Sequence, residues 1–322
     1  MQVVLTGCAG FIGSHLAKRL LDLGMSVTGI DCFDETLYPA ALHREQLAPL
    51  LQHPRFRFVE GNILDVDLLD ALTKDASAMI HLAALAGVRP SLHQAARYMR
   101  YNVEGTQNIL SACQRSGISR IVFASSSSVY GSHCAVPFRE DDPAVLPASP
   151  YAASKRAGEL LCATHCDLYG GSIAALRFFT VYGPHQRPEM AIASFAARIL
   201  RGETVFLHGS GESARDYTYI DDIIDGIIAA LDKTSDRSLG LRCYNLGGER
   251  TTTLRKLVSI LEASLGRSAR IEWRPDQPGD VPVTWSSLQR SRSELGYVPK
   301  VDIEQGIHRY ADWIRARLAN TF

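Results

Sequence analysis

The chain has 322 residues, of which 46% are hydrophobic, and its 34 Lys and Arg residues balance 34 Asp and Glu residues. This length accommodates one large core and a smaller second lobe, and a formal net charge of zero disfavours a protein that binds nucleic acid or a membrane surface. The longest apolar runs are strand-length or carry charges, so none is suited to span a membrane.

The seven cysteines are scattered and form no CxxC pair, which predicts free thiols in the reducing cytosol. Cys162 and Cys166 are one helical turn apart, but no nearby Cys/His pair completes a metal site, so we expect no bound metal. The N-terminus MQVVLTG leads directly into a predicted strand and lacks the basic region of a signal peptide. We therefore expect a cytoplasmic protein.

Strand-like apolar runs alternate with helical patterns over the first 178 residues. The predicted strands cover residues 2–6, 26–30, 56–60, 78–83, 120–125 and 172–178, and the predicted helices lie near 11–24, 67–74, 91–116 and 150–169. Alternation at this spacing predicts an α/β fold whose parallel sheet carries helices on both faces. We take residues 1–178 as the first domain.

The remaining residues, 179–322, are richer in Pro, Gly and Arg and have shorter predicted elements. Helices are predicted near 190–201, 221–232 and 253–265, and residues 273–300 look loop-rich. We expect this part to form a substrate lobe, with a segment of about 217–246 returning to the first domain.

A glycine-rich turn, TGCAGFIGSH, follows the first predicted strand and opens the first predicted helix. Gly7, Gly10 and Gly13 form GxxGxxG, a variant of the dinucleotide-binding pattern, and Phe11 and Ile12 belong to the same turn. The missing Cβ atoms let a pyrophosphate approach backbone N–H groups at the helix start. Glycines that serve packing alone are the alternative interpretation.

Asp31 ends the second predicted strand, 18 residues after Gly13. A carboxylate there accepts hydrogen bonds from the adenosine ribose hydroxyls and repels a 2′-phosphate, so NAD is predicted over NADP. A plain turn-forming Asp is the alternative. The remaining residues assigned to the cofactor are Asn62, Ile63, Leu82, Ala83, Ala84 and Asn102.

The segment PYAASK places Tyr151 and Lys155 four residues apart, on one face of a predicted helix. An ammonium group beside a phenol favours the phenolate, which would let Tyr151 act as a base. The segment FASSSSVYG places serines 125–128 at the carboxyl end of the fifth strand, where open α/β sheets keep their sites. A surface Tyr–Lys pair and a hydrogen-bonded strand end are the alternatives.

Together these motifs resemble the extended short-chain dehydrogenase/reductase family over nearly the whole chain, including the late segments RDYTYIDDI, NLGGE and QPGDVPVTW. The resemblance implies a Rossmann-type doubly wound sheet that binds NAD, a smaller C-terminal α/β lobe for a sugar nucleotide, and a homodimer. It also assigns roles by motif. Ser126, Tyr151 and Lys155 would be catalytic, Phe178 would pack against nicotinamide, Arg215 would meet the nucleotide diphosphate, and Asp280 would meet the uridine ribose.

The residues before VYG separate the reactions of that family. Its sugar-nucleotide 4,6-dehydratases carry Asp-Glu there and its UDP-glucuronate decarboxylases carry Glu, whereas this chain has Ser127 and Ser128. The resemblance therefore leaves epimerisation through a 4-keto sugar. A neutral-sugar UDP-glucose/UDP-galactose 4-epimerase is the main alternative, and a non-catalytic NAD-binding regulator is a remote one.

The segment RFFTVYGPHQRP and the AGVRPS segment around Arg89 resemble the UDP-glucuronate 4-epimerases. A guanidinium binds a carboxylate bidentately, so we predict that Arg187 serves the C6 carboxylate of a uronic acid, with Thr180 and Ser127 or Ser128. Arg89 is a second candidate, and a loop salt bridge is the alternative role of Arg187.

The chain departs from that family at two places. Cys32 and His43 stand where the family tends to have Asn and Lys, which puts the contacts to the cofactor's ribose in doubt. His185 and Gln186 replace a Trp-Gly pair.

Overall fold

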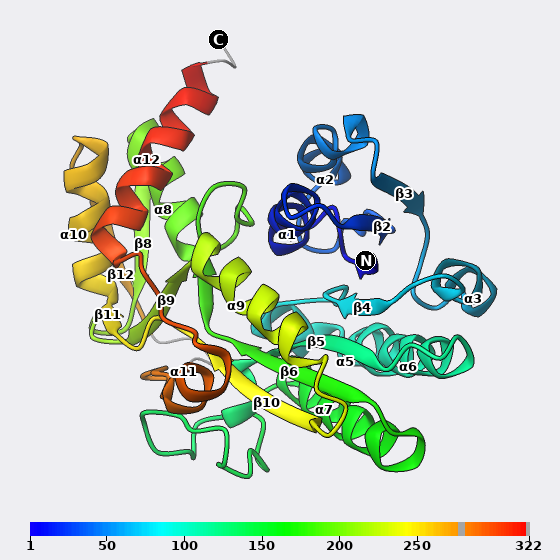
Figure 1. Ribbon diagram of the computed structural model, residues 1–322. Coiled ribbons are helices and arrows are strands. Elements are labelled where there is room, and N and C mark those ends of the chain that lie inside the picture. The colour runs from blue at the N-terminus through cyan, green and yellow to red at the C-terminus, as the bar shows by residue number, and fades with distance from the viewer. Residues whose placement is uncertain (276–280, 320–322) are drawn as a thin grey trace.

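A seven-stranded parallel sheet forms the centre of the computed structural model, which describes residues 1–275 and 281–319. The strand order is β10-β6-β5-β4-β1-β2-β3 (Figure 1). The strands are β1 (Gln2–Thr6), β2 (Ser26–Asp31), β3 (Phe56–Glu60), β4 (Ala78–His81), β5 (Arg120–Ser126), β6 (Ser172–Phe178) and β10 (Gly240–Leu246). The predicted α/β fold with a Rossmann-type parallel sheet is confirmed.

Helices cover both faces of this sheet and thereby bury its central strands on both sides. One face carries α1 (Phe11–Asp22) and α9 (Ile220–Lys233), with α2 (Ala40–Leu47) and the 3₁₀ turn η1 (Leu50–Gln52) beside α1. The other face carries α3 (Val66–Thr73), α6 (Gly105–Arg115) and α7 (Pro150–Tyr169). The chain thus buries separate apolar cores above and below the sheet.

The helix predicted near 91–116 is divided into several segments. They are α4 (Val88–His93), α5 (Ala95–Met99), the π-helical turn η2 (Arg100–Glu104) and α6. Gln94, with φ −131° and ψ 34°, leaves helical geometry and separates the first two. The wider π turn contains the buried Asn102, which a uniform helical period does not anticipate.

The C-terminal lobe combines two small sheets with a helical layer (Figure 1). One sheet has the order β11-β9-β7, and the other pairs β12 with β8 in parallel. Helix α10 packs against both α8 and α12. The bounds are β7 (Thr180–Tyr182), α8 (Ala191–Arg201), β8 (Thr204–His208), β9 (Ala214–Tyr219), β11 (Thr251–Thr253), α10 (Leu254–Leu265), β12 (Arg270–Arg274), α11 (Gln289–Leu295) and α12 (Ile303–Ala319).

Between the two lobes the chain crosses over more than once. After β9 it enters α9 and then β10, which pairs with β6 and completes the large sheet. The sequence patterns did not predict α2, α11 or α12. Within the described residues, no helix combines the length and apolar character needed to cross a bilayer.

Candidate active site

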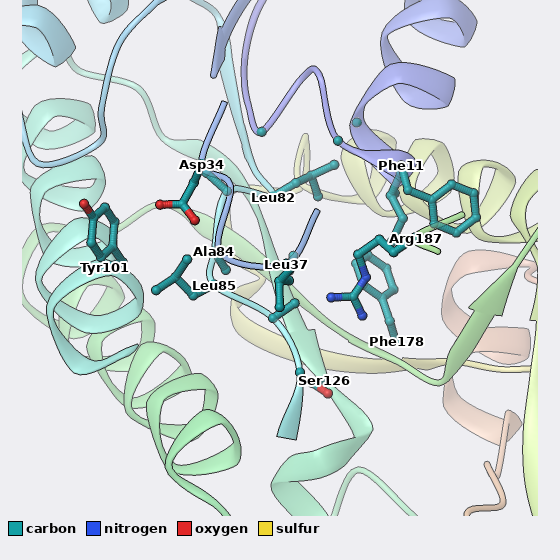
Figure 2. A pocket seen from close by; sticks show the side chains of 18 of the residues that line it. Phe11, Asp34, Leu37, Leu82, Ala84, Leu85, Tyr101, Ser126, Phe178 and Arg187 are labelled. Carbon is teal, nitrogen blue, oxygen red and sulfur yellow. The ribbon is translucent and has the colours of Figure 1, made fainter. Parts of the chain in front are cut away.

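A cavity of about 410 Å³ lies at the carboxyl edge of the large sheet. Open parallel sheets bind ligands at this edge, at the point where the strand order reverses, which here is between β1 and β4. Figure 2 shows side chains of both lobes facing this space, among them Phe11, Ser126, Phe178 and Arg187. The predicted residues that line it are Gly7, Gly10, Phe11, Ile12, Gly13, Asp31, Asn62, Ile63, Leu82, Ala83, Ala84, Ser126, Ser127, Ser128, Tyr151, Lys155, Phe178, Thr180 and Arg187.

The glycine turn leaves no room for a side chain at Gly7 or Gly13. Gly7 has φ +73°, and a Cβ on Gly13 would lie 2.0 Å from the carbonyl oxygen of Gly7. Helix α1 begins directly after Gly10, whose residue type offers no side-chain cap for the first N–H groups. A tight turn with open N–H groups at a helix start fits the pyrophosphate of a dinucleotide.

Asp31 is held at the end of β2 by the backbone. Its Oδ2 accepts from the N–H of Ala9 at 3.0 Å, and its Oδ1 accepts from the N–H of Phe33 at 2.9 Å. Burial raises the pKa of Asp31, while these N–H groups and the nearby His43 act in the opposite direction. The fixed carboxylate faces the same cavity as the glycine turn, the arrangement that a ribose diol requires.

Asn102 lies behind the cavity wall rather than in its lining. Its Oδ1 accepts from the N–H of Leu85 at 2.8 Å, and its Nδ2 donates to the Leu85 carbonyl and to Ser154 Oγ, both at 2.9 Å. Asn102 therefore joins the loop after β4 to helix α7.

The catalytic candidates converge from two elements. Ser126 ends β5, and its Oγ lies 3.1 Å from Ser128 Oγ. Ser149 caps α7 by accepting from the N–H of Ala152 at 3.1 Å, and this start places Tyr151 in the first turn. Lys155, one turn later, donates from Nζ to the carbonyl oxygen of Ala124 at 2.7 Å.

Burial dominates the electrostatics of this group. It raises the pKa of Tyr151, and a hydrogen bond with Ser126 and the charge of Arg187 partly oppose that rise. Burial lowers the pKa of Lys155 to about 8. Lys155 donates from its ammonium to a backbone carbonyl, and its expected effect on the Tyr151 pKa stays a prediction.

A buried ion pair connects helix α7 to strands β5 and β6 next to the catalytic candidates. Glu159 on α7 accepts from Arg177 Nε at 2.8 Å and Nη2 at 2.9 Å, and from Ser125 Oγ at 2.6 Å. The Arg177 guanidinium also lies 4.8 Å from the ring centroid of Tyr130. This cluster joins α7, β5, β6 and the VYG turn. We did not predict it, although Glu159 follows Lys155 by one helical turn.

Arg187 lines the same cavity, on the loop after β7. Its Nη1 is 3.2 Å from Glu189 Oε1, but this nitrogen is buried without an aligned hydrogen-bond acceptor. The ion pair agrees with a loop salt bridge, and the unused donor is available to a further carboxylate. The salt bridge within the loop and the binding of a substrate carboxylate therefore both remain compatible with the position of Arg187.

Residues 3–247 match the model of the NAD dependent epimerase/dehydratase family. The chain belongs to this family.

Similar proteins that cover most of this chain include several UDP-glucuronate 4-epimerases. UDP-glucuronate 4-epimerase 4 of Arabidopsis thaliana is 41% identical over 330 residues, which cover 97% of this chain and 75% of that protein. UDP-glucuronate 4-epimerase of Thermodesulfobacterium geofontis is 37% identical over 318 residues, or 98% and 96% of the two chains. UDP-glucuronic acid 4-epimerase from Bacillus cereus, solved with UDP-glucuronic acid and NAD, gives a TM-score of 0.92 at 36% identity, with 98% and 100% coverage.

Two residues that the epimerase/dehydratase resemblance assigned to the substrate are not in the cavity lining, and a third is not described. Arg89 lies on α4. Arg215, on β9, donates from Nη1 to the carbonyl oxygens of Ala214 at 3.0 Å and Pro282 at 3.3 Å. Asp280 lies outside the described residues.

Other lining residues were not assigned to the site from the sequence. Tyr38, His43 and Tyr101 line the cavity near Asp31 and the loop after β4. They come from segments whose approach depends on tertiary packing. In the described part of the chain, no group of three His, Cys, Asp or Glu side chains is placed to hold a metal ion.

Proposed function

We infer that this protein is an NAD-dependent UDP-glucuronate 4-epimerase, which converts UDP-glucuronic acid to UDP-galacturonic acid through a 4-keto sugar. The observation that carries this inference is one cavity that contains Ser126, Tyr151 and Lys155 together with Arg187. Among the described lining residues, the acidic side chains are Asp31 and Asp34, both near the end of β2. The serine loop therefore lacks the carboxylates that water loss or decarboxylation would use.

The glycine turn and Asp31 would hold the cofactor, with Asn62, Ile63 and residues 82–84 along its length and Phe178 at the nicotinamide end. Asn102 would act indirectly, by fixing the loop after β4. Bound NAD⁺ supplies a two-electron acceptor for C4 of the sugar and is regenerated in each cycle.

Tyr151 would remove the proton of the C4 hydroxyl, and Ser126 would share that proton by hydrogen bonding to the same oxygen. Lys155 would hold positive charge beside the tyrosine. The 4-keto sugar then turns over about its link to the diphosphate, so that C4 is reduced on its opposite face. Arg215 is proposed for the diphosphate, because the two carbonyls that accept from it do not cancel its charge.

The substrate carboxylate gives Arg187 a second task. A 4-keto uronic acid is a β-keto acid and loses CO₂ when its breaking bond aligns with the carbonyl π system. Arg187, with Thr180 and Ser127 or Ser128, would fix the carboxylate away from that alignment. This role adds kinetic control to binding.

The test of the function uses the purified protein with UDP-glucuronic acid and no added NAD, followed by NMR of the sugar. Formation of UDP-galacturonic acid is expected. A UDP-pentose product would overturn the argument from the serine loop. If only UDP-glucose is turned over after NAD is added, the neutral-sugar epimerase replaces this function.

The role of Arg187 is tested with Arg187→Ala. A charge-assisted bond contributes about 1.5–3 kcal/mol, so we expect a roughly 10- to 100-fold lower kcat/KM for UDP-glucuronic acid and a larger yield of CO₂. UDP-glucose turnover is the internal control. Unchanged turnover together with unchanged CO₂ yield would remove Arg187 from the carboxylate site.

We also propose a cytoplasmic homodimer. All seven cysteines are free, as expected for a reducing compartment. Helix α7 exposes Leu160, Leu168 and Tyr169, and an apolar face of this kind favours association with a second copy.

A further inference from the structure

His43 is a buried polar residue in the wall of the cavity. It lies on α2 and is 7% exposed. Within the described chain, neither of its ring nitrogens has a well-aligned hydrogen-bond partner, although the Ala9 backbone is close enough to oppose the lowering of its pKa by burial. Buried polar groups in native proteins are nearly always paired, so an imidazole without an aligned partner beside a ligand cavity indicates a contact to the ligand.

Packing fixes the orientation of this ring. The ring of Tyr38 stacks on it with a centroid distance of 4.2 Å and an interplanar angle of 6°. Phe33 meets it edge-on at 6.3 Å and 70°, and the Arg44 guanidinium lies 4.1 Å from the Phe33 ring centroid. The imidazole is thus held by aromatic neighbours, which leaves its nitrogens available.

Asp31 is the charged neighbour of His43. Burial lowers the pKa of His43 and the Asp31 carboxylate opposes that effect, so the two side chains interact across the cavity wall. A carboxylate only accepts hydrogen bonds, whereas a neutral imidazole offers one donor and one acceptor. A hydroxyl, which both donates and accepts, can therefore use both groups at once.

We propose that His43 is a cofactor-recognition residue, whose imidazole hydrogen-bonds a hydroxyl of the adenosine ribose that Asp31 also binds. The proposal rests on the NAD site of the proposed function. It gives the departure from lysine a chemical meaning, because lysine donates only and carries a fixed charge, while this imidazole completes a neutral donor–acceptor set. The ribose contact, which the sequence left in doubt, is assigned to a different chemical group.

The experiment measures binding to the full chain after its bound cofactor has been exchanged out. Calorimetry compares NAD with its adenosine 2′-deoxy and 3′-deoxy analogues, for the natural protein and for His43→Phe. Phenylalanine keeps an aromatic ring to stack on Tyr38 and removes both nitrogens. We expect His43→Phe to bind NAD about 3- to 10-fold more weakly than the natural protein does. For the analogue that lacks the contacted hydroxyl, the same substitution should cause no loss of affinity.

Two comparisons make the result decisive. His165→Phe, at a buried histidine of α7 that does not line the cavity, should bind NAD as the natural protein does. His43→Gln, which restores a donor and an acceptor, should recover part of the affinity if His43→Phe folds poorly. Equal losses for NAD and both analogues, or no loss at all, would overturn the proposal. Because no sugar is present, tight NAD binding without epimerisation would overturn the proposed function and leave this inference standing.

Discussion

Tyr151 lies close to both Ser126 and Arg187. Burial raises its pKa, and a hydrogen bond with Ser126 and the charge of Arg187 act in the opposite direction. The guanidinium proposed to bind the carboxylate thus also favours the phenolate. Substrate charge and base strength are linked through Arg187.

Replacement of Tyr151 by Phe tests the acid–base role. Loss of a general acid–base group lowers kcat by about 10²- to 10⁴-fold, and bound NAD should remain. Turnover by NMR and the cofactor content of the purified protein provide the two readings. The control is Tyr169→Phe, an exposed position at the end of the same helix. Near-normal turnover in Tyr151→Phe would exclude this residue as the base.

Burial of the Lys155 ammonium lowers the stability of the folded protein, and the same group is proposed to take part in catalysis. Its pKa falls from 10.5 to about 8 on burial, so between pH 8 and 10.5 the unfolded chain binds a proton that the folded chain has released. Stability attributable to this group therefore rises with pH across that window, and the cost at pH 7 is about 3 kcal/mol. Lys155→Met should be inactive, yet more stable than the natural protein at pH 7.

Urea unfolding at pH 7 and pH 10 measures this difference. The advantage of Lys155→Met should shrink at the higher pH. It should also stay below the full cost, since the carbonyl of Ala124 loses its donor. An advantage that does not depend on pH would show that hydrophobic packing, and not the charge, is responsible.

Sequence patterns identified most of the predicted residues that line the cavity because those residues follow strands directly. The glycine turn and serines 125–128 belong to single strand ends, and parallel strands bring such ends together. The contacts of Arg215 and Asn102 could not be predicted from the sequence, because their partners include backbone groups of segments distant in sequence. Nothing in the local pattern shows that Asn102 turns toward Leu85.

At the scale of elements, the Glu159–Arg177 pair ties α7 to β6. Both side chains are almost fully buried, with exposures of 0% and 2%. Removing one partner of a buried pair costs about 3–5 kcal/mol, whereas replacing both with apolar residues is often neutral. Glu159→Gln should therefore be strongly destabilised, and the double variant Glu159→Met/Arg177→Met should recover much of the loss.

Urea denaturation of the two variants decides this point, with Glu203→Gln in the exposed Arg201–Glu203 pair as the control. The control should unfold like the natural protein. Epimerase activity adds a second reading, because the pair also holds Ser125 next to Ser126. A double variant that is stable but slow would assign the pair to positioning.

The elements that the sequence analysis missed have a common physical cause. Helix α2 buries only His43 and Leu47, so it lacks the repeating apolar stripe that identifies a helix. The break at Gln94 and the π turn disturb the helical period between 88 and 105. By contrast, strands β1, β4, β5 and β6 each contain an unbroken apolar run, and their predicted bounds agree with the structure within a few residues.

At the scale of the whole molecule, α7 carries both Tyr151, the proposed base, and exposed apolar side chains. Leu160 is 54% exposed and Leu168 67%. A charge placed at the proposed interface disfavours association, so Leu160→Glu should convert the dimer to a monomer. Light scattering coupled to size-exclusion chromatography measures the mass, and Leu51→Glu, on the 3₁₀ turn beside α2, is the control. A monomeric natural protein would refute the dimer.

The loop that carries Arg187 is held by both lobes. The ring of His185 lies 6.0 Å from that of His15 on α1 and 4.9 Å from that of Trp313 on α12. Its carbonyl oxygen accepts from Gln46 on α2 at 3.4 Å, and Arg317 of α12 pairs with Glu45 of α2.

For protein engineering, this loop therefore cannot be exchanged without regard to the helices that it contacts. Grafting residues 183–190 from a neutral-sugar enzyme would bring a foreign loop into contact with α1, α2 and α12, none of which touches the sugar carboxylate in our proposal. A change of substrate would require accompanying changes in all three helices. A change of sugar specificity in such an enzyme thus requires more substitutions than the small number of substrate contacts suggests.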